Sequence, residues 1–434
     1  KGKAFSGRNF RVQVSPLDCT GCENCARTCP AKDKALVMRP AAEMAQEQAN
    51  WNFAVSLPET AVGEADTIPL AQAKTPLFEF SGACAGCGET PYIKLLTQLF
   101  GSHLMIANAT GCSSIYAGSA PSCPYTVNQK GQGVAWGNSL FEDNAEFGFG
   151  MYLAMKHRRA HLAEQVETLA AQCPEAAESC RAWLGSREDT ALSAQAGKAL
   201  LAACETLSHP LVKEIADSAD LLAAKSVWLI GGDGWAFDIG FSGLDHVLAS
   251  GEKVRVLVLN TQVYSNTGGQ ASKATPAGAA ARLMSGGKSG AEKDLGLMAM
   301  TYGHVYVAQV AMGANPNQLL KAVREAEAWD GAALIIAYAP CIAHGIDMRD
   351  VQEIEKKAVQ CGYFPLYRYH PANGLMLDSK APDGDFQAFL MRQGRFAALR
   401  RSDPAKSETL CKMAEEAAQR RWNLLKMLKN REMP

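Results

Sequence analysis

Short apolar runs recur along most of the chain, separated by stretches that are either amphipathic or rich in glycine. Five runs have the length of a buried strand, at residues 103–110, 225–230, 253–260, 304–310 and 333–340. Helical sequence, such as "TPYIKLLTQLF" before the first run, lies between them. Buried strands that alternate with helices are typical of a parallel sheet covered on both faces. The pattern therefore predicts an α/β fold with a doubly wound, mostly parallel sheet.

Polar and glycine-rich segments follow three of these runs directly. Gly111 and Cys112 come after the first run, "GGDGW" after the second and "TQVYSNTGGQ" after the third. In open parallel sheets, ligands bind at the carboxyl ends of the strands. We therefore expect a ligand site where these segments meet.

The character of the sequence changes outside the predicted sheet. Residues 1–40 hold the densest group of cysteines, and residues 41–75 are polar and predict a connector. The α/β domain is expected over residues 76–385. Within it, residues from about 150 to 225 are rich in alanine, glutamate and leucine at helical spacing, which predicts a helical insertion. Residues 386–434 are polar and charged and predict a C-terminal helical extension.

Composition excludes some classes of partner. The 434 residues carry a net charge of −1, so there is no electrostatic case for nucleic acid or an anionic membrane. The apolar runs are too short to span a bilayer, and no signal peptide opens the chain. The chain begins at Lys1 without methionine, which suggests a fragment or a processed product. Eight of 14 cysteines lie in the first 123 residues of this long chain, which favours metal or redox use in a reducing cytoplasm over a disulfide scaffold.

The cysteines of "CTGCENCARTCP" have the spacing of a bacterial ferredoxin, in which three thiolates hold one [4Fe–4S] cluster and the fourth ligates a second cluster. They are Cys19, Cys22, Cys25 and Cys29. A zinc knot is the alternative. A two-cluster fold needs a second such run, and none follows downstream. Either that run lies upstream of Lys1 and the ferredoxin-like module is only partial here, or the segment holds one cluster and a spare cysteine.

"GGDGW" at a strand end could bring the backbone close to a phosphate and offer the Asp233 carboxylate to Mg²⁺. Gly-Asp-Gly alone is also a common turn. About 27 residues later, Asn260 and Thr261 end the next apolar run. This pair of segments resembles the thiamine diphosphate (TPP) motif, with threonine in place of the second asparagine. The resemblance assigns Mg²⁺ to the Asp233 and Thr261 side chains and the Val263 carbonyl.

A second set of cysteines is dispersed along the predicted sheet. Cys84 and Cys87 precede a helix, whereas Cys112 and Cys341 follow apolar runs. Thiolates that converge from separate segments suggest another [4Fe–4S] cluster, with a four-thiolate zinc site or a Cys84–Cys87 disulfide as alternatives. Cys123 is an alternative fourth ligand. We expect the remaining cysteines to be structural: Cys173, Cys180, Cys204, Cys361 and Cys411.

Together these motifs resemble the C-terminal part of pyruvate:ferredoxin (flavodoxin) oxidoreductases of the long single-chain type. The resemblance rests on "CTGCENCARTCP", "SGACAGCGETPY", "NATGCSSIY", "GGDGWAFDIG", "NTQVYSNTGGQ" and "APCIAHG", which occur in this order. It implies that the second cysteine set holds the cluster nearest to TPP. It also implies that Asn266 faces the substrate and, with Glu89, supports catalysis. The residues implied to contact the cofactor are Glu89, Cys112, Gly232, Asp233, Gly234, Trp235, Thr261, Gln262, Val263, Tyr264, Ser265 and Asn266.

The same resemblance implies an activity. It is the oxidative decarboxylation of pyruvate with coenzyme A to acetyl-CoA and CO2, in which electrons pass from TPP through [4Fe–4S] clusters to ferredoxin or flavodoxin. It also implies a homodimer, and N-terminal domains, absent from this sequence, that complete the TPP, pyruvate and coenzyme A sites. The alternatives are the same chemistry on another 2-oxo acid and an electron-transfer subunit without catalysis.

Overall fold

A computed structural model describes residues 5–7, 9–59, 65–119, 121–140 and 142–430. Its centre is an eight-stranded sheet in the order β2-β1-β3-β4-β6-β5-β7-β8. The first six strands in this order are parallel, and β7 and β8 are antiparallel additions at one edge. The predicted mostly parallel α/β fold is therefore confirmed. The strands are β1 (Leu104–Ala109), β2 (Ala135–Ser139), β3 (Ser226–Gly231), β4 (Arg255–Asn260), β5 (Tyr306–Val310), β6 (Ala333–Tyr338), β7 (Tyr367–His370) and β8 (Gly374–Leu377).

Alternate residues of the central strands enter two separate cores. In β3, Val227 and Leu229 pack into one core and Trp228 and Ile230 into the other, because successive strand side chains point to opposite faces. One face is covered by α3 (Ile68–Gln72), α4 (Thr90–Phe100) and α12 (Pro316–Ala328). The opposite face is covered mainly by the first part of α6 (Asn144–Gln172), α10 (Phe241–Ala249), α11 (Leu295–Met300), α13 (Val351–Gln360) and α16 (Pro404–Lys429). Both faces are therefore buried, as a doubly wound sheet requires.

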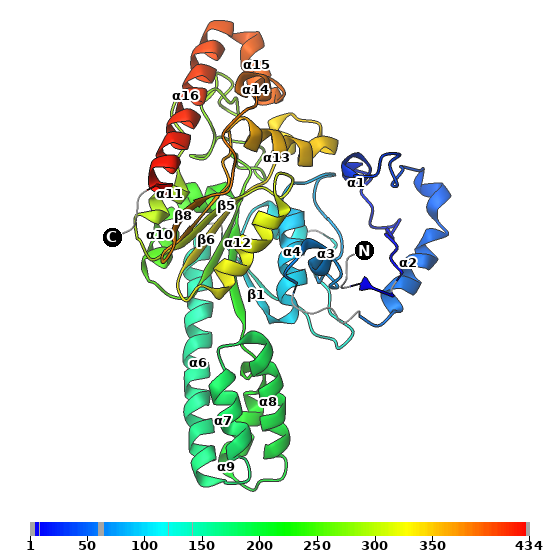
Figure 1. Ribbon diagram of the computed structural model, residues 1–434, viewed down its shortest axis with the longest axis vertical. Coiled ribbons are helices and arrows are strands. Elements are labelled where there is room, and N and C mark those ends of the chain that lie inside the picture. The colour runs from blue at the N-terminus through cyan, green and yellow to red at the C-terminus, as the bar shows by residue number, and fades with distance from the viewer. Residues whose placement is uncertain (1–4, 8, 60–64, 120, 141, 431–434) are drawn as a thin grey trace.

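A helical subdomain extends from one end of the molecule, at the bottom of Figure 1. It consists of the far half of α6 with α7 (Ala177–Ser186), α8 (Thr190–Cys204) and α9 (Pro210–Asp217). These helices share a small core of their own, which includes Trp183, Leu200 and the thiols of Cys180 and Cys204. The first residue of α6 is Asn144, a few residues before the expected start of the insertion.

At the opposite end, α14 (Phe386–Met391), α15 (Gly394–Ser402) and α16 pack on the sheet through Phe389, Phe396 and Leu425. These C-terminal helices are therefore part of the main core. No helix in the described ranges has both the length and the apolar character needed to cross a bilayer.

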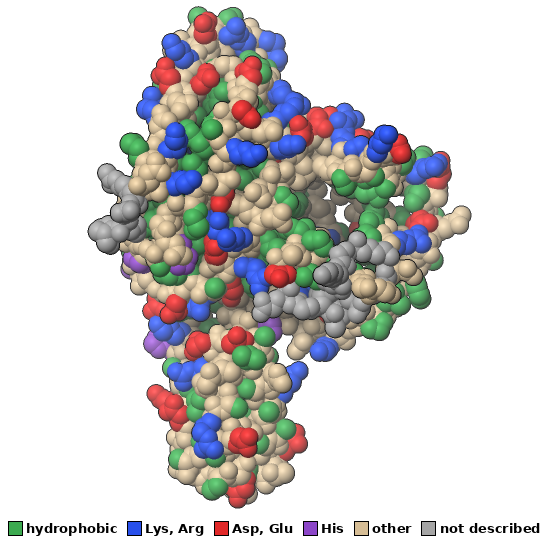
Figure 2. All heavy atoms as spheres, viewed as in Figure 1, with side chains coloured by type: hydrophobic (Ala, Val, Ile, Leu, Met, Phe, Trp, Pro, Cys, Tyr) green, Lys and Arg blue, Asp and Glu red, His purple; other side chains and the backbone are tan. Residues whose placement is uncertain are grey.

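The N-terminal segment, defined here as residues 9–59, has a different character. It contains α1 (Asn24–Thr28), η2 (Ala41–Met44) and α2 (Glu47–Ser56), none of which buries a residue. Figure 2 shows a hollow between this segment and the body of the molecule. Since α1 and α2 add nothing to the core, the placement of the segment depends on local contacts.

Candidate functional site

Four neighbouring parallel strands bring the predicted site residues to one edge of the sheet. Because β1, β3, β4 and β6 run in the same direction, their carboxyl ends lie side by side. Cys112 follows β1, Asp233 follows β3, Thr261 follows β4 and Cys341 follows β6. The topology therefore assembles residues that are up to about 230 positions apart in the sequence.

A cavity of about 260 Å³ lies at this edge. It is lined by all four cysteines of the second set together with Glu89, Tyr116, Thr261, Ser265 and Asn266 among others. Burial raises the pKa of the Cys112 thiol, and the charges of Glu89, Cys341, Cys87 and Cys84 raise it further. Within the described ranges, no three His, Cys, Asp or Glu side chains are placed to hold one metal ion. The four cysteines share the lining of one cavity.

The loop of Cys84 and Cys87 lies directly against the segment that carries Cys341. A Cβ added to Gly88 would lie 2.7 Å from both the backbone nitrogen and the carbonyl oxygen of Pro340, closer than a real Cβ contact allows. Glycine at position 88 thus permits the close approach of the two backbones. The sequence assigned Cys341 mainly by resemblance. In the structure, Cys341 lines the same cavity as the other three cysteines. Cys123 does not line the cavity, and its thiol contacts the Ala117 carbonyl instead.

The predicted magnesium ligands form a compact group beside this cavity. Thr261 Oγ1 lies 2.8 Å from Asp233 Oδ2 and 3.1 Å from the Val263 carbonyl oxygen, and the Val263 backbone N–H donates to Asp233 Oδ2. Asp233 Oδ1 is buried and has no hydrogen-bond partner. Burial raises the pKa of Asp233 to about 8, although the bonds from Thr261 and Val263 oppose the shift. A buried carboxylate oxygen without a partner, next to a hydroxyl and a carbonyl, fits a site for a hard divalent cation.

The loop between these ligands has an unusual backbone that buried side chains hold in place. Gln262 has a φ of 60°, in the left-handed region that residues other than glycine seldom adopt. Its side-chain oxygen accepts hydrogen bonds from the Tyr363 hydroxyl at 2.6 Å and from Arg395 at 2.7 Å. The Thr275 hydroxyl donates to its carbonyl at 2.6 Å. The C-terminal helices therefore stabilise the loop through Arg395.

Not every predicted cofactor residue lines the cavity. Gln262 points its side chain away, toward Tyr363 and Arg395, and is 2% exposed. Trp235 is 1% exposed and belongs to the core of the sheet. The others that lie outside the cavity lining are Gly232, Asp233, Gly234, Val263 and Tyr264. Asp233 and Val263 nevertheless contact Thr261, which does line it.

His344 is a site residue that sequence reasoning missed. It is fully buried and its Nε2 lies 2.6 Å from the Thr261 carbonyl oxygen. Burial, with the charge of Arg395, holds the pKa of His344 well below its usual value, so the ring is neutral. Because a carbonyl only accepts, Nε2 must carry the proton. His344 thus links the Cys341 segment to the Asp233–Thr261 group. Its position in "APCIAHG", just beyond a strand end, was the available signal.

Glu89, which follows the cysteine loop, is a buried acid that titrates near neutral pH. It is 5% exposed, and burial raises its pKa to about 7. The Tyr116 hydroxyl donates to Glu89 Oε2 at 3.1 Å, which partly opposes this shift. Tyr116 is the second contributor that sequence reasoning missed. Both side chains line the cavity, so Glu89 can hold or release a proton there.

The cysteines of the N-terminal run divide into three and one. Burial raises the pKa of the Cys25 thiol, and the charges of Cys22 and Cys19 raise it further. The pKa of Cys29 is lowered, chiefly by a hydrogen bond from the backbone of Ala31, with further backbone bonds from Ala35 and Leu36. The assignment of three of these thiols to one cluster and of Cys29 to another stays a prediction.

The sheet, the Asp233 group and the adjoining cavity define a thiamine diphosphate-binding domain. Residues 215–337 match the sequence family described as thiamine pyrophosphate enzyme, C-terminal TPP binding domain. This range contains Asp233, Thr261 and Val263. The match supports the TPP motif that the sequence predicted.

Longer relatives match nearly the whole chain. Pyruvate:ferredoxin oxidoreductase of Moorella thermoacetica is 55% identical over 98% of this chain and 38% of its own length. Pyruvate-flavodoxin oxidoreductase of Klebsiella pneumoniae is 49% identical over 95% of this chain and 36% of its own length. A solved 2-oxoglutarate:ferredoxin oxidoreductase of Magnetococcus marinus is 16% identical, and the match covers 60% of this chain and 64% of that one. Its TM-score of 0.35 is too low for a comparison of the two folds. Along nearly its whole length the chain is similar to these pyruvate:ferredoxin and pyruvate-flavodoxin oxidoreductases, and it spans less than two fifths of the relatives' own length.

Proposed function

We propose that the protein containing this chain catalyses oxidative decarboxylation of pyruvate with coenzyme A to acetyl-CoA and CO2, and passes the electrons to ferredoxin or flavodoxin. The names of the relatives supply the substrate and the acceptor. The observation that carries the proposal is the shared wall of the cavity, where four cysteines meet Thr261 of the Asp233 group. A TPP enzyme without a redox step has no need of thiolates at this place.

TPP, Mg²⁺ and [4Fe–4S] clusters are the cofactors of this proposal. Asp233, Thr261 and the Val263 carbonyl would hold Mg²⁺, since they offer three hard oxygens. Cys84, Cys87, Cys112 and Cys341 would hold one cluster. A four-thiolate zinc site, with each sulfur at about 2.3 Å from one ion, is the alternative. Cys19, Cys22 and Cys25 would hold a second cluster, with Cys29 turned toward another.

The side chains around the cavity suggest how this part of the site works. TPP supplies an electron sink for the decarboxylation when it is bound. Glu89, with a pKa of about 7, holds or releases a proton at Oε2 within the cavity. Tyr116 orients this carboxyl group through its hydrogen bond. Asn266 lines the same cavity and presents an amide that can bind a carbonyl or carboxylate oxygen.

The remaining parts of the proposal concern the complete assembly. It would be a cytoplasmic homodimer, and other domains would complete the binding of TPP, pyruvate and coenzyme A. The relatives are more than twice as long as this chain, which leaves room for such domains.

The Asp233→Asn variant of the complete protein tests the TPP–Mg²⁺ assignment. We expect Mg²⁺-dependent TPP binding to fall by at least about tenfold, because an amide replaces a charged ligand. Asp245→Asn is the matched control, since Asp245 lies on α10 and binds the Tyr302 hydroxyl away from the cavity. Calorimetric titration measures both variants. Equal TPP affinity in Asp233→Asn and the parent protein would refute the magnesium assignment.

A further inference from the structure

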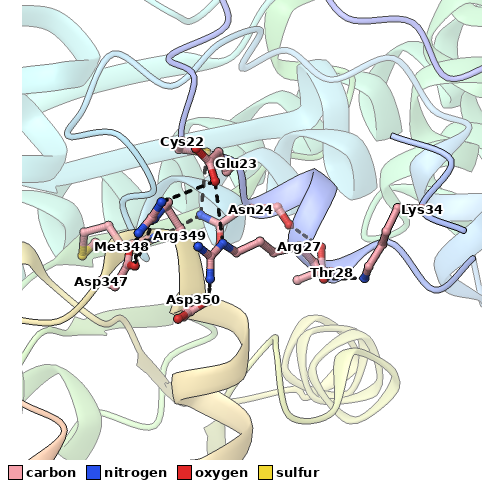
Figure 3. Close-up of polar contacts among 10 residues, drawn as sticks. All are labelled: Cys22, Glu23, Asn24, Arg27, Thr28, Lys34, Asp347, Met348, Arg349 and Asp350. Carbon is pink, nitrogen blue, oxygen red and sulfur yellow. Dashed lines mark hydrogen bonds and ion pairs between the residues drawn. The ribbon is translucent and has the colours of Figure 1, made fainter. Parts of the chain in front are cut away.

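The short helix α1 lies within the N-terminal cysteine run and contacts the segment that follows Cys341. Figure 3 shows the two groups of side chains facing each other, from residues 22–27 and residues 347–350. We call this set of interactions the α1 contact. The cavity described above takes one lining residue, Met348, from the same segment. The α1 contact therefore joins the two cysteine sets through a few residues.

Asn24 lies at the centre of the α1 contact. Its Nδ2 donates to the Met348 carbonyl oxygen at 3.1 Å and lies 3.7 Å from Cys22 Sγ. The loop of the second cysteine set meets the same point. A Cβ on Gly86 would lie 2.5 Å from the Met348 carbonyl oxygen and 3.0 Å from Asn24 Nδ2, and Gly86 has a φ of +77°. One amide group thus contacts a thiol of the first set and the wall of the cavity formed by the second.

Asn24 lies among ion pairs to which both segments contribute positive and negative side chains. Arg27 lies 2.8 Å from Asp350 and 3.7 Å from Glu23. Arg349 lies 2.7 Å from Asp347 and 3.7 Å from Glu23 (Figure 3). The hydrogen bond from Arg349 is the main cause that lowers the pKa of Asp347 to about 2. Opposite charges therefore come from both sides of the contact and link α1 to the segment after Cys341.

Within the described ranges, the helices of the N-terminal segment add no buried residue that would hold it against the sheet domain. Neither α1 nor α2 buries a residue, so apolar packing contributes little. Farther along the segment, Gln129 donates to the Leu57 carbonyl at 2.8 Å. The position of the cysteine run relative to the cavity consequently depends on polar interactions, which salt and charge reversal weaken.

We propose that the α1 contact is an electrostatic docking surface that fixes the cysteine run beside the four-cysteine cavity, with Asn24 as its positioning residue. Asn24 holds Cys22 at the cavity wall and offers it a hydrogen-bond donor. The proposed docking of α1 does not depend on a bound cofactor. The proposed effect of Asn24 on a cluster rests on the proposed function above.

Charge reversal tests the docking in the full chain without metal. We expect Arg27→Glu and Asp350→Arg each to raise hydrogen exchange in peptides covering residues 19–34 about fivefold or more, because each places like charges together. The double variant restores the opposite pair, and its exchange should return to within about twofold of the parent. Arg11→Glu is the control, since Arg11 pairs with Glu47 inside the N-terminal segment. Unchanged exchange in the single variants, or no recovery in the double variant, would overturn the proposal.

Asn24→Ala tests the positioning role in the cluster-loaded full chain. Loss of a donor to a ligand thiolate destabilises the more negative reduced cluster, so its reduction potential should fall. Asn24→Gln keeps the amide donor and should recover part of the shift. Redox titration followed by electron paramagnetic resonance measures the potential. A potential that does not change in Asn24→Ala would contradict this role. A parent chain that binds no iron and sulfide would instead refute the proposed function, whereas the exchange experiment would still decide the docking.

Discussion

The two cysteine sets bring several thiols together in different ways. The run at residues 19–29 is one continuous stretch of chain that includes α1, and its cysteines range from exposed Cys19 and Cys25 to buried Cys29. The cavity set comes from three separate segments around a parallel sheet, and its thiols are close only because the strands β1 and β6 are in register with their neighbours. The first set depends on local sequence and the second on the whole fold.

This difference has chemical consequences. Burial raises the pKa of Cys87, Cys112 and Cys341, so these thiols stay protonated in the absence of a bound cation or cluster. Backbone hydrogen bonds lower the pKa of Cys29 in the run. Glu89 lines the cavity together with the second set, and His344 lies against the Thr261 carbonyl, whereas ion pairs lie beside the run. The two sets therefore differ in the polar groups that surround them.

Of the predicted changes, substitution of Cys87 should have the largest effect, and it should affect the cavity set without affecting the run. Cys87→Ser removes one of four thiolates that have no local replacement, so the anaerobically reconstituted full chain should lose about four iron and four sulfide and keep the cluster of the run. Iron and sulfide analysis with electron paramagnetic resonance measures the loss. Cys123→Ser is the control, because Cys123 lies outside the cavity.

The same experiment separates the alternatives for the cavity. If Cys123→Ser lost as much iron as Cys87→Ser, the ligand set would be wrong. Zinc at one per chain without sulfide in the parent protein would exclude the cluster.

Alkylation of the reduced, metal-free full chain should show the next largest effect. The thiolate is the reactive form, so a lowered pKa favours Cys29 at pH 7 and a raised pKa protects Cys87. We expect Cys29 to react at least about tenfold faster, and the rate at Cys87 to rise about tenfold per pH unit above pH 7. Mass spectrometry of iodoacetamide-treated protein gives both rates. Equal rates at pH 7 would show that the two environments do not differ as described.

Substitution of His344 should have the smallest effect. It tests the hydrogen bond that links the Cys341 segment to the Thr261 carbonyl. His344→Ala removes one hydrogen bond to the Thr261 carbonyl, worth roughly 1 kcal/mol, so Mg²⁺–TPP affinity should fall about fivefold. His344→Gln can still donate and should recover part of the loss. Calorimetric titration of the complete protein measures both. Full affinity in His344→Ala would mean that His344 does not position Thr261.

Sequence patterns were sufficient for the central strands but not for the edges of the sheet. The buried strands β1, β3, β4, β5 and β6 coincide with continuous apolar runs, because both faces of each are covered. The strand β2, with the sequence AWGNS, and the strand β7, with the sequence YRYH, were not predicted. Each is short and polar; β2 pairs with β1, and β7 pairs with β5 and with β8, which follows it directly in the chain.

The candidate site was partly predictable for a related reason. Strand ends and cysteine spacing singled out the candidate segments, and the resemblance to the TPP motif and to the oxidoreductases assigned Asp233, Thr261 and Cys341. They could not predict that Gln262 turns toward Tyr363 and Arg395, because its direction depends on a positive φ and on partners about 100 and 133 residues away. His344 and Tyr116 were missed because a single histidine or tyrosine in a sequence carries no indication of its partner.

The four-cysteine cavity shares Thr261 with the Asp233 group that we propose binds TPP and Mg²⁺. Hyperfine spectroscopy of the reduced cluster in the complete protein, loaded with carbon-13-labelled TPP, measures this most directly. We predict a coupling between the label and a cluster that is lost in Cys87→Ser and kept in Cys123→Ser. A protein with the cavity cluster formed and TPP bound, but with no coupling between them, would contradict the account.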